Sequence, residues 1–211
     1  MDQNHHRSPC CHHVSVVDNS LAISRAIPLP NNTFTSTNGA HFLGSDKGEF
    51  GGSLKISLGS VVSTYNIAPI HMLPIKQSLY LFSGGAHLGT VTGSVFVIKD
   101  SNKPEKPTLL TLLPDMPIAS LFDGSNESYW RLVILGTRSI SIMSPLSEYS
   151  VYDDSPFLEL FAWKPWPEEF IPNSIVKLHG YYFIGGNYGI VAINENPGKD
   201  GIKIYYKPIG P

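Results

Sequence analysis

The feature that most constrains the fold of this chain is a short strand pattern that recurs four times. In each copy an apolar strand ends in glycine, a turn follows, and a second strand with alternating apolar residues leaves the turn. The copies cover residues 40–58, 78–99, 131–144 and 181–195. Their terminal glycines, which we call the marker glycines, are Gly44, Gly84, Gly136 and Gly185, at spacings of 40, 52 and 49 residues. A strand-rich repeat of this length is typical of the β-propeller, in which each repeat forms one twisted four-stranded blade.

The composition agrees with a β-rich chain. Charged residues are only 15% of the 211 residues, against about 25% in an average globular domain. Seventeen prolines are scattered along the chain, and no window of a dozen residues shows helical apolar spacing without a proline. We therefore predict an all-β fold with almost no helix.

The repeats also predict which strands are central. The runs "LYLF", "LVIL" and "YYFI" are continuously apolar, as expected for strands covered on both faces by neighbouring blades. The segments "VSVVD" and "LAISRAIPL" could form a further blade, closed against the C-terminal "GIKIYYKPIG". We predict a small β-propeller of four blades and a fifth, with residues 13–211 as one domain and residues 1–12 as a flexible tail. An irregular β-sandwich is the alternative.

Two of the four hairpins contain additional residues. Ten residues separate Gly44 from Leu54 and eleven separate Gly84 from Val95, whereas the later hairpins turn within four or five. We predict two long loops side by side on one face of the scaffold, where function often concentrates. They carry the polar side chains Asp46, Lys47, Glu49 and His87. These residues could form a binding site or an acid–base or metal cluster, but they are equally typical of turns that hydrogen-bond their own backbone.

The first of these loops carries a resemblance. The stretch "GSDKGEFGG", residues 44–52, resembles a pattern in uncharacterised bacterial propeller-like proteins: Gly, a small residue, Asp, any residue, then Gly-Glu-aromatic-Gly-Gly. In those proteins a Gly-x-x-His-Leu element tends to follow in the next blade, and "GGAHL", residues 84–88, is similar to it. The resemblance covers about a third of the chain. It implies a propeller of bacterial type and no particular activity.

A second candidate surface lies between residues 150 and 170. Acidic residues alternate there with aromatic residues and prolines; those singled out are Tyr152, Asp153, Asp154, Trp163, Trp166, Glu168 and Glu169. Aromatic side chains anchor protein partners, and acidic side chains steer basic ones. The alternative is that the tryptophans pack in the core while the acidic residues are solvated.

The N-terminal residues offer six possible zinc ligands, namely His5, His6, Cys10, Cys11, His12 and His13. Their spacing matches no structural zinc pattern, so we expect a polar tail and no metal or other cofactor. The adjacent Cys10 and Cys11 give no support for an oxidising compartment. No signal-peptide core and no run of 18 apolar residues is present, so we expect a cytoplasmic protein without a membrane-spanning helix.

The charge and motifs restrict the function. With a formal net charge of −2 and no basic run, nucleic acid is not expected as a direct partner. No nucleophile elbow, phosphate-binding loop or His-Glu-x-x-His motif is present. We therefore favour a non-catalytic protein-binding propeller over an enzyme, specifically an immunity or inhibitor protein that caps a basic toxin such as a nuclease. The alternatives are a hydrolase or lyase using Asp46, Glu49 and His87, and a lectin-like sugar-binding module. The predicted partner-binding residues are Asp46, Glu49, His87, Tyr152, Asp153, Asp154, Trp166, Glu168 and Glu169.

Overall fold

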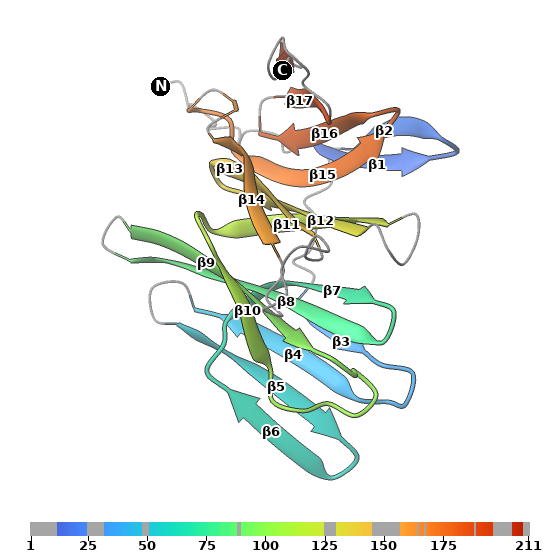
Figure 1. The fold of residues 1–211 in the computed structure, drawn as a ribbon, viewed down its shortest axis with the longest axis vertical. Helices are drawn as coiled ribbons and strands as arrows, with labels where there is room; N and C mark the ends of the chain where they lie inside the picture. Colours follow the sequence, from blue (N-terminus) through green and yellow to red (C-terminus); the bar gives the residue numbers. More distant parts are fainter. Residues whose placement is uncertain are drawn as a thin grey trace, which may run out of the picture. The chain divides into compact units, whose positions relative to one another are not determined.

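The computed structural model describes residues 12–24, 32–47, 51–87, 90–124, 130–144, 157–163, 165–166, 168–187, 189–195 and 204–208. All regular structure among them is β: four antiparallel sheets of four strands and one of two (Figure 1). The all-β prediction is confirmed. The described residues contain no helix, and thus none that could cross a membrane.

Each four-stranded sheet consists of strands that are consecutive in the chain and paired in chain order. The first comprises β3 (Thr33–Thr35), β4 (His41–Asp46), β5 (Gly52–Leu58) and β6 (Val61–Tyr65). The second comprises β7 (Pro69–Ile75), β8 (Ser78–His87), β9 (Thr90–Ile98) and β10 (Thr108–Leu113). The third comprises β11 (Pro117–Gly124), β12 (Trp130–Gly136), β13 (Ser139–Ser144) and β14 (Phe157–Trp163). The fourth comprises β15 (Pro172–Leu178), β16 (Tyr181–Gly186), β17 (Gly189–Asn194) and β18 (Ile204–Pro208).

The four predicted hairpins are the two central strands of these four sheets. They are the antiparallel pairs β4–β5, β8–β9, β12–β13 and β16–β17. The looser stretches between the hairpins supply the two outer strands of each sheet, as predicted. The recurring pattern in the sequence therefore marks one meandering sheet per copy.

The prediction of a long loop is wrong for the second hairpin, and the connection in the first, residues 47–51, is shorter than predicted. β4 continues past Gly44 to Asp46, which pairs with Gly52, and β8 continues to His87, which pairs with Thr90. The additional residues lengthen the ladders. Glycine is required there for close approach: a Cβ on Gly93 would lie 2.3 Å from the carbonyl oxygen of Asp115.

The chain divides into two compact units. One, which we call the central unit, spans Leu29–Trp163 and holds the first three four-stranded sheets. The other, the terminal unit, combines Met1–Pro28 with Lys164–Pro211 and holds the fourth sheet and the two-stranded sheet.

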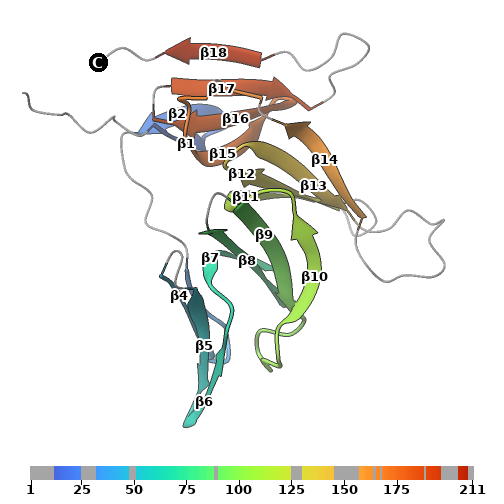
Figure 2. The same ribbon diagram turned by 90° about the vertical axis from the view of Figure 1, so that its left-hand side faces the viewer.

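The three sheets of the central unit pack in succession (Figure 2). Leu81 of β8 belongs to a core cluster shared with β4 and β5, whereas its neighbour Phe82 belongs to a cluster shared with β12 and β13. β8 is therefore buried on both faces, as its continuous apolar run predicted. β12 is likewise buried at four consecutive residues, from Leu132 to Leu135.

The marker glycines allow the next segment of the chain to pack closely. A Cβ on Gly44 would lie 3.0 Å from the carbonyl oxygen of Pro69, where β7 begins. A Cβ on Gly84 would lie 2.9 Å from the Cδ of Pro117, where β11 begins. In both places the register shifts just after the proline, which suits an outer strand because proline cannot donate a ladder hydrogen bond.

In the terminal unit, β1 (His13–Val17) and β2 (Ser20–Ser24) form the two-stranded sheet. β1 packs on the fourth sheet: the Val14 N–H donates to the Ser174 hydroxyl (3.1 Å), and the His12 N–H donates to the Gly186 carbonyl (2.9 Å). β18 pairs with β17 and completes the fourth sheet, whereas the sequence suggested closure against β1 and β2. His12, at the end of the predicted tail, is buried, and residues 1–11 lie outside the described part of the chain.

Candidate functional site

Two of the three proposed acid–base residues, Asp46 and His87, lie at the ends of central strands of two sheets. Asp46 is exposed at the end of β4, and His87 is the last residue of β8. The ends of β4 and β8 lie on the same side of the central unit in Figure 1. The Lys47 N–H donates to the Gly51 carbonyl (2.7 Å), as expected for a turn residue. Glu49 lies outside the described residues, as does the side chain of His87, so a cluster of the three remains a prediction.

The acidic and aromatic segment is described only in part. Tyr152, Asp153 and Asp154 lie outside the described residues. Trp166 is only 8% exposed and packs against Phe170, with ring centroids 5.9 Å apart.

The acidic residues after Trp166 are placed differently. Glu168 and Glu169 are both exposed in the turn before β15. Carboxylates in that position can meet a partner without any rearrangement of the core, whereas Trp166 contributes to packing.

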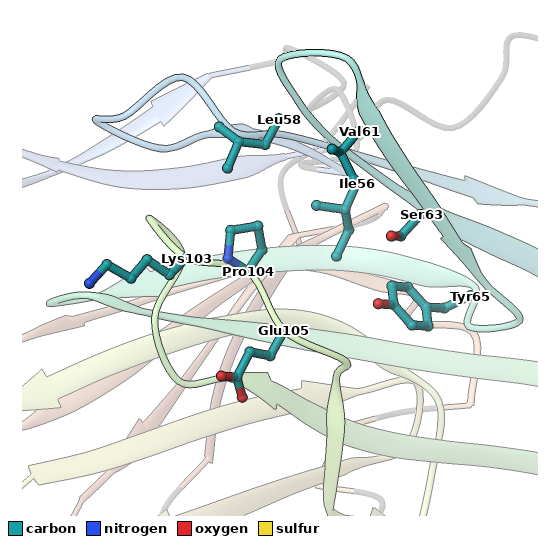
Figure 3. Close-up of a pocket in the computed structure, with 8 residues that line it drawn as sticks. All are labelled: Ile56, Leu58, Val61, Ser63, Tyr65, Lys103, Pro104 and Glu105. Carbon is teal, nitrogen blue, oxygen red and sulfur yellow. The ribbon is translucent and has the colours of Figure 1, made fainter.

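The central unit has a groove of about 430 Å³ at the outer end of its first sheet (Figure 3). Its lining residues come from β5, β6 and the segment between β9 and β10: Ile56, Leu58, Val61, Ser63, Tyr65, Lys103, Pro104 and Glu105. The sheet side is mostly apolar with two hydroxyl groups. The opposite wall carries one cation and one anion on either side of a proline.

The β5–β6 hairpin positions the sheet side of the groove. Leu58 pairs with Val61 across the Gly59–Ser60 turn, and Ile56 pairs with Ser63. Gly59 has φ +58°, which a two-residue hairpin turn requires and which glycine adopts without strain. Side chains of paired residues share a face, so the alternating sequence places all five sheet-side residues in the groove.

The opposite wall is held by hydrogen bonds to other parts of the central unit. The Ser101 N–H donates to the Gln77 carbonyl (2.7 Å), and the Lys103 N–H donates to the Asp100 carbonyl (3.1 Å). The Asn102 side-chain oxygen accepts a hydrogen bond from the Thr37 hydroxyl (2.7 Å) in the β3–β4 turn. The sheet side is thus fixed by strand pairing and the opposite wall by hydrogen bonds to the turns before β8 and β4, so the groove is preformed.

Two further polar groups of the central unit, Asp115 and His71, have structural explanations. Asp115 is 1% exposed and accepts hydrogen bonds from the Met116 N–H (2.8 Å), the Thr137 hydroxyl and the Arg138 N–H. It holds the turn between β12 and β13. Burial lowers the pKa of His71 to about 4, and its ring lies 5.5 Å from that of Phe82. His71 is therefore a neutral core side chain at physiological pH.

The described residues show no arrangement that points to metal chemistry. No group of three or more His, Cys, Asp or Glu side chains within them is placed to hold a metal ion. The groove lining contains neither histidine nor cysteine. Its chemistry suits non-covalent binding, through apolar contact, hydroxyl hydrogen bonds and two charges of opposite sign.

Sequence analysis did not find this groove. Its residues are ordinary strand residues, and its two walls are about 40 residues apart in the chain. A usable signal was present in "VVSTY", residues 61–65: an outer strand with no charge and no proline, in a chain rich in proline.

Comparisons of the chain with protein-family models, curated proteins and solved structures found no match.

Proposed function

We propose that this chain is a non-catalytic protein-binding scaffold that holds an extended segment of a partner protein in the groove beside β6. The observation that carries the proposal is the preformed groove, with its apolar sheet side and its charged wall at Lys103 and Glu105. A groove of this kind suits a segment with apolar side chains toward β5 and polar side chains toward the opposite wall.

The scaffold itself is proposed to be a propeller. Support comes from the consecutive meander sheets, each with a buried central hairpin, and from the successive packing of the three sheets in the central unit. In a propeller, the first strand of each blade lies innermost and long outer edges are largely protected. Small-angle scattering that fits only an extended chain of separate sheets would contradict this arrangement.

We further propose that the partner is basic and that the protein acts in the cytoplasm as an inhibitor of a toxin. The exposed Glu168 and Glu169 support a basic partner, because carboxylates at the rim of an interface accelerate the association of cations. The predicted contribution of Asp153 and Asp154 rests on the sequence.

The test is co-purification of the tagged chain with its partner from the native source, followed by variants. Leu58→Glu replaces an apolar contact in the groove with a charge and should lower the affinity at least about tenfold, because removing a charge from water is costly. Leu43→Glu is the matched control: Leu43 is 51% exposed on the opposite face of the same sheet and should bind like the wild type. Equal binding by both variants would refute the groove as the site.

A second pair of measurements separates an inhibitor from an enzyme. Glu168→Gln with Glu169→Gln should slow association and weaken its salt dependence with little effect on stability. Asp46→Asn, Glu49→Gln and His87→Gln should affect an inhibitor less than an enzyme, in which loss of an acid–base group typically lowers the rate by about 100- to 10,000-fold. If one of these three variants abolishes turnover on a broad substrate panel, the hydrolase or lyase alternative is correct.

A further inference from the structure

β6 is an outer strand without the usual protection against pairing. Its five residues, Val61–Tyr65, include no proline and no charged residue, and its pairing with β5 is regular throughout. Most other outer strands of the four-stranded sheets contain a proline, a charged residue or a register shift; these are β7, β10, β11, β14, β15 and β18. β3 has only three residues. Proteins generally blunt exposed edges in these ways, so an unprotected edge indicates a strand partner.

The hairpin geometry defines which backbone groups of β6 face outward. In a two-residue hairpin the residues flanking the turn, here Leu58 and Val61, exchange hydrogen bonds, and such pairs alternate along the ladder. Val61, Ser63 and Tyr65 therefore direct their N–H and C=O groups toward β5. Val62 and Thr64 direct theirs to the free edge. The side chains of Val61 and Val62 are 67% and 54% exposed.

We propose that β6 pairs with β6 of a second copy, antiparallel and centred on Ser63, to form a symmetric dimer. In this register Val62 exchanges two backbone hydrogen bonds with Thr64 of the second copy, and the symmetric pair adds two more. Ser63 lies opposite Ser63 of the second copy in a pair without hydrogen bonds, where side chains come closest. Val61 lies opposite Tyr65 of the second copy, a β-branched and aromatic pair of the kind that stabilises sheets.

The strand is self-complementary, and this is why a second copy is favoured over an unrelated strand. When two copies of "VVSTY" run antiparallel and are centred on Ser63, each valine lies opposite a tyrosine or a threonine, and no like charges meet. Lys103 and Glu105, on the groove wall opposite β6, have opposite signs and together add no net charge to that wall. The chain's formal charge of −2 produces little repulsion between copies.

The dimer would join the two first sheets into one continuous eight-stranded sheet. Val61, Ser63 and Tyr65 of both copies then lie on one face, so the two grooves become neighbours across the axis. A dimer would thus present two equivalent sites for a partner. The inference is independent of the proposed function, because it rests on the backbone edge and the sequence of β6.

The test combines sedimentation equilibrium with two charged variants of Ser63. The wild type should dimerise. Ser63→Lys and Ser63→Glu each place like charges opposite one another and should raise the dissociation constant at least about tenfold. An equimolar mixture of the two should dimerise again, because opposite charges then face each other; this recovery also shows that both variants are folded. A monomeric wild type at about 100 μM, or a mixture no tighter than either variant alone, would overturn the proposal.

The register is tested by cross-linking in a Cys10→Ser, Cys11→Ser background. Ser63→Cys should form an intermolecular disulfide under mild oxidation, because residues at the axis lie within reach of one another. Thr64→Cys is the matched control, since the two Thr64 residues are offset from each other in this register and should not cross-link. Cross-linking at Thr64 equal to or above that at Ser63 would refute the register.

Discussion

Substituting two adjacent glycines of β8 should have opposite effects on stability. A Cβ on Gly84 would lie 2.7 Å from the Met116 Cγ, 2.9 Å from the Pro117 Cδ and 3.0 Å from the Thr92 carbonyl oxygen. A Cβ on Gly85 would meet no atom within 4 Å. The Met116 side chain can adjust, but the proline ring and the backbone oxygen cannot move without shifting β11 or β9. Gly84→Ala therefore tests whether the marker glycine lets the next sheet pack closely.

The expected magnitudes follow from these contacts. Overpacking of a tight site typically costs about 1–3 kcal/mol, whereas Gly→Ala in an open strand site gains roughly 0.5 kcal/mol through the unfolded chain. Gly84→Ala should thus be less stable than Gly85→Ala by about 2–3 kcal/mol. At about 2–4 °C per kcal/mol for a chain of this size, the Tm values should differ by about 4–12 °C.

The assay is urea denaturation followed by tryptophan fluorescence, with thermal melts followed by circular dichroism. Both variants should keep the m-value of the wild type, because the surface exposed on unfolding does not change. Equal stability of the two variants, or a larger loss for Gly85→Ala, would refute the role assigned to the marker glycines.

Three further predictions concern the interior of the central unit. Burial lowers the pKa of His71 to about 4, so the folded state binds fewer protons than the unfolded state. Roughly 3 kcal/mol of stability should therefore be present above pH 6.5 and lost as the pH falls toward 4. His71→Gln should flatten this pH dependence in urea titrations at pH 7 and 4.5. Asp115→Ala should cost about 3 kcal/mol, because it leaves the Thr137 hydroxyl and the Arg138 N–H without their acceptor. The loss should be clearly larger than for Thr137→Ala. Unchanged stability of Asp115→Ala in denaturation would contradict the role of Asp115 in holding this turn. Leu81→Ala and Ile134→Ala should each cost about 2–5 kcal/mol, since both side chains are buried; neutrality of both in the same assay would mean that these strands are not central.

The positions of the strands were determined by local sequence. The alternation in "SLKIS" predicts one buried and one exposed face, and the structure buries Leu54 and Ile56 while exposing Lys55. Continuous runs such as "LVIL" predict burial on both faces, as found for β12. These patterns are readable because the side-chain period of a strand is two and requires no knowledge of distant partners.

Local sequence signals failed where one residue type occurs for two different structural reasons. The glycines at 84, 85 and 93 predicted a loop, but they belong to a continuous ladder. Glycine occurs both in turns and where another backbone approaches closely, and only the tertiary structure shows that the segment from Asp115 to Pro117 occupies the space beside Gly84 and Gly93.

The candidate site, likewise, was decided only by tertiary structure. Tyr65 and Glu105 carry no local sign of a shared role, and they line one groove because the segment after β9 is anchored by Asn102 to the turn before β4. The sequence by itself determined which residues form strands and which strands pair with their chain neighbours. Tertiary structure decided which surfaces face each other, because those contacts depend on packing between segments 40 or more residues apart.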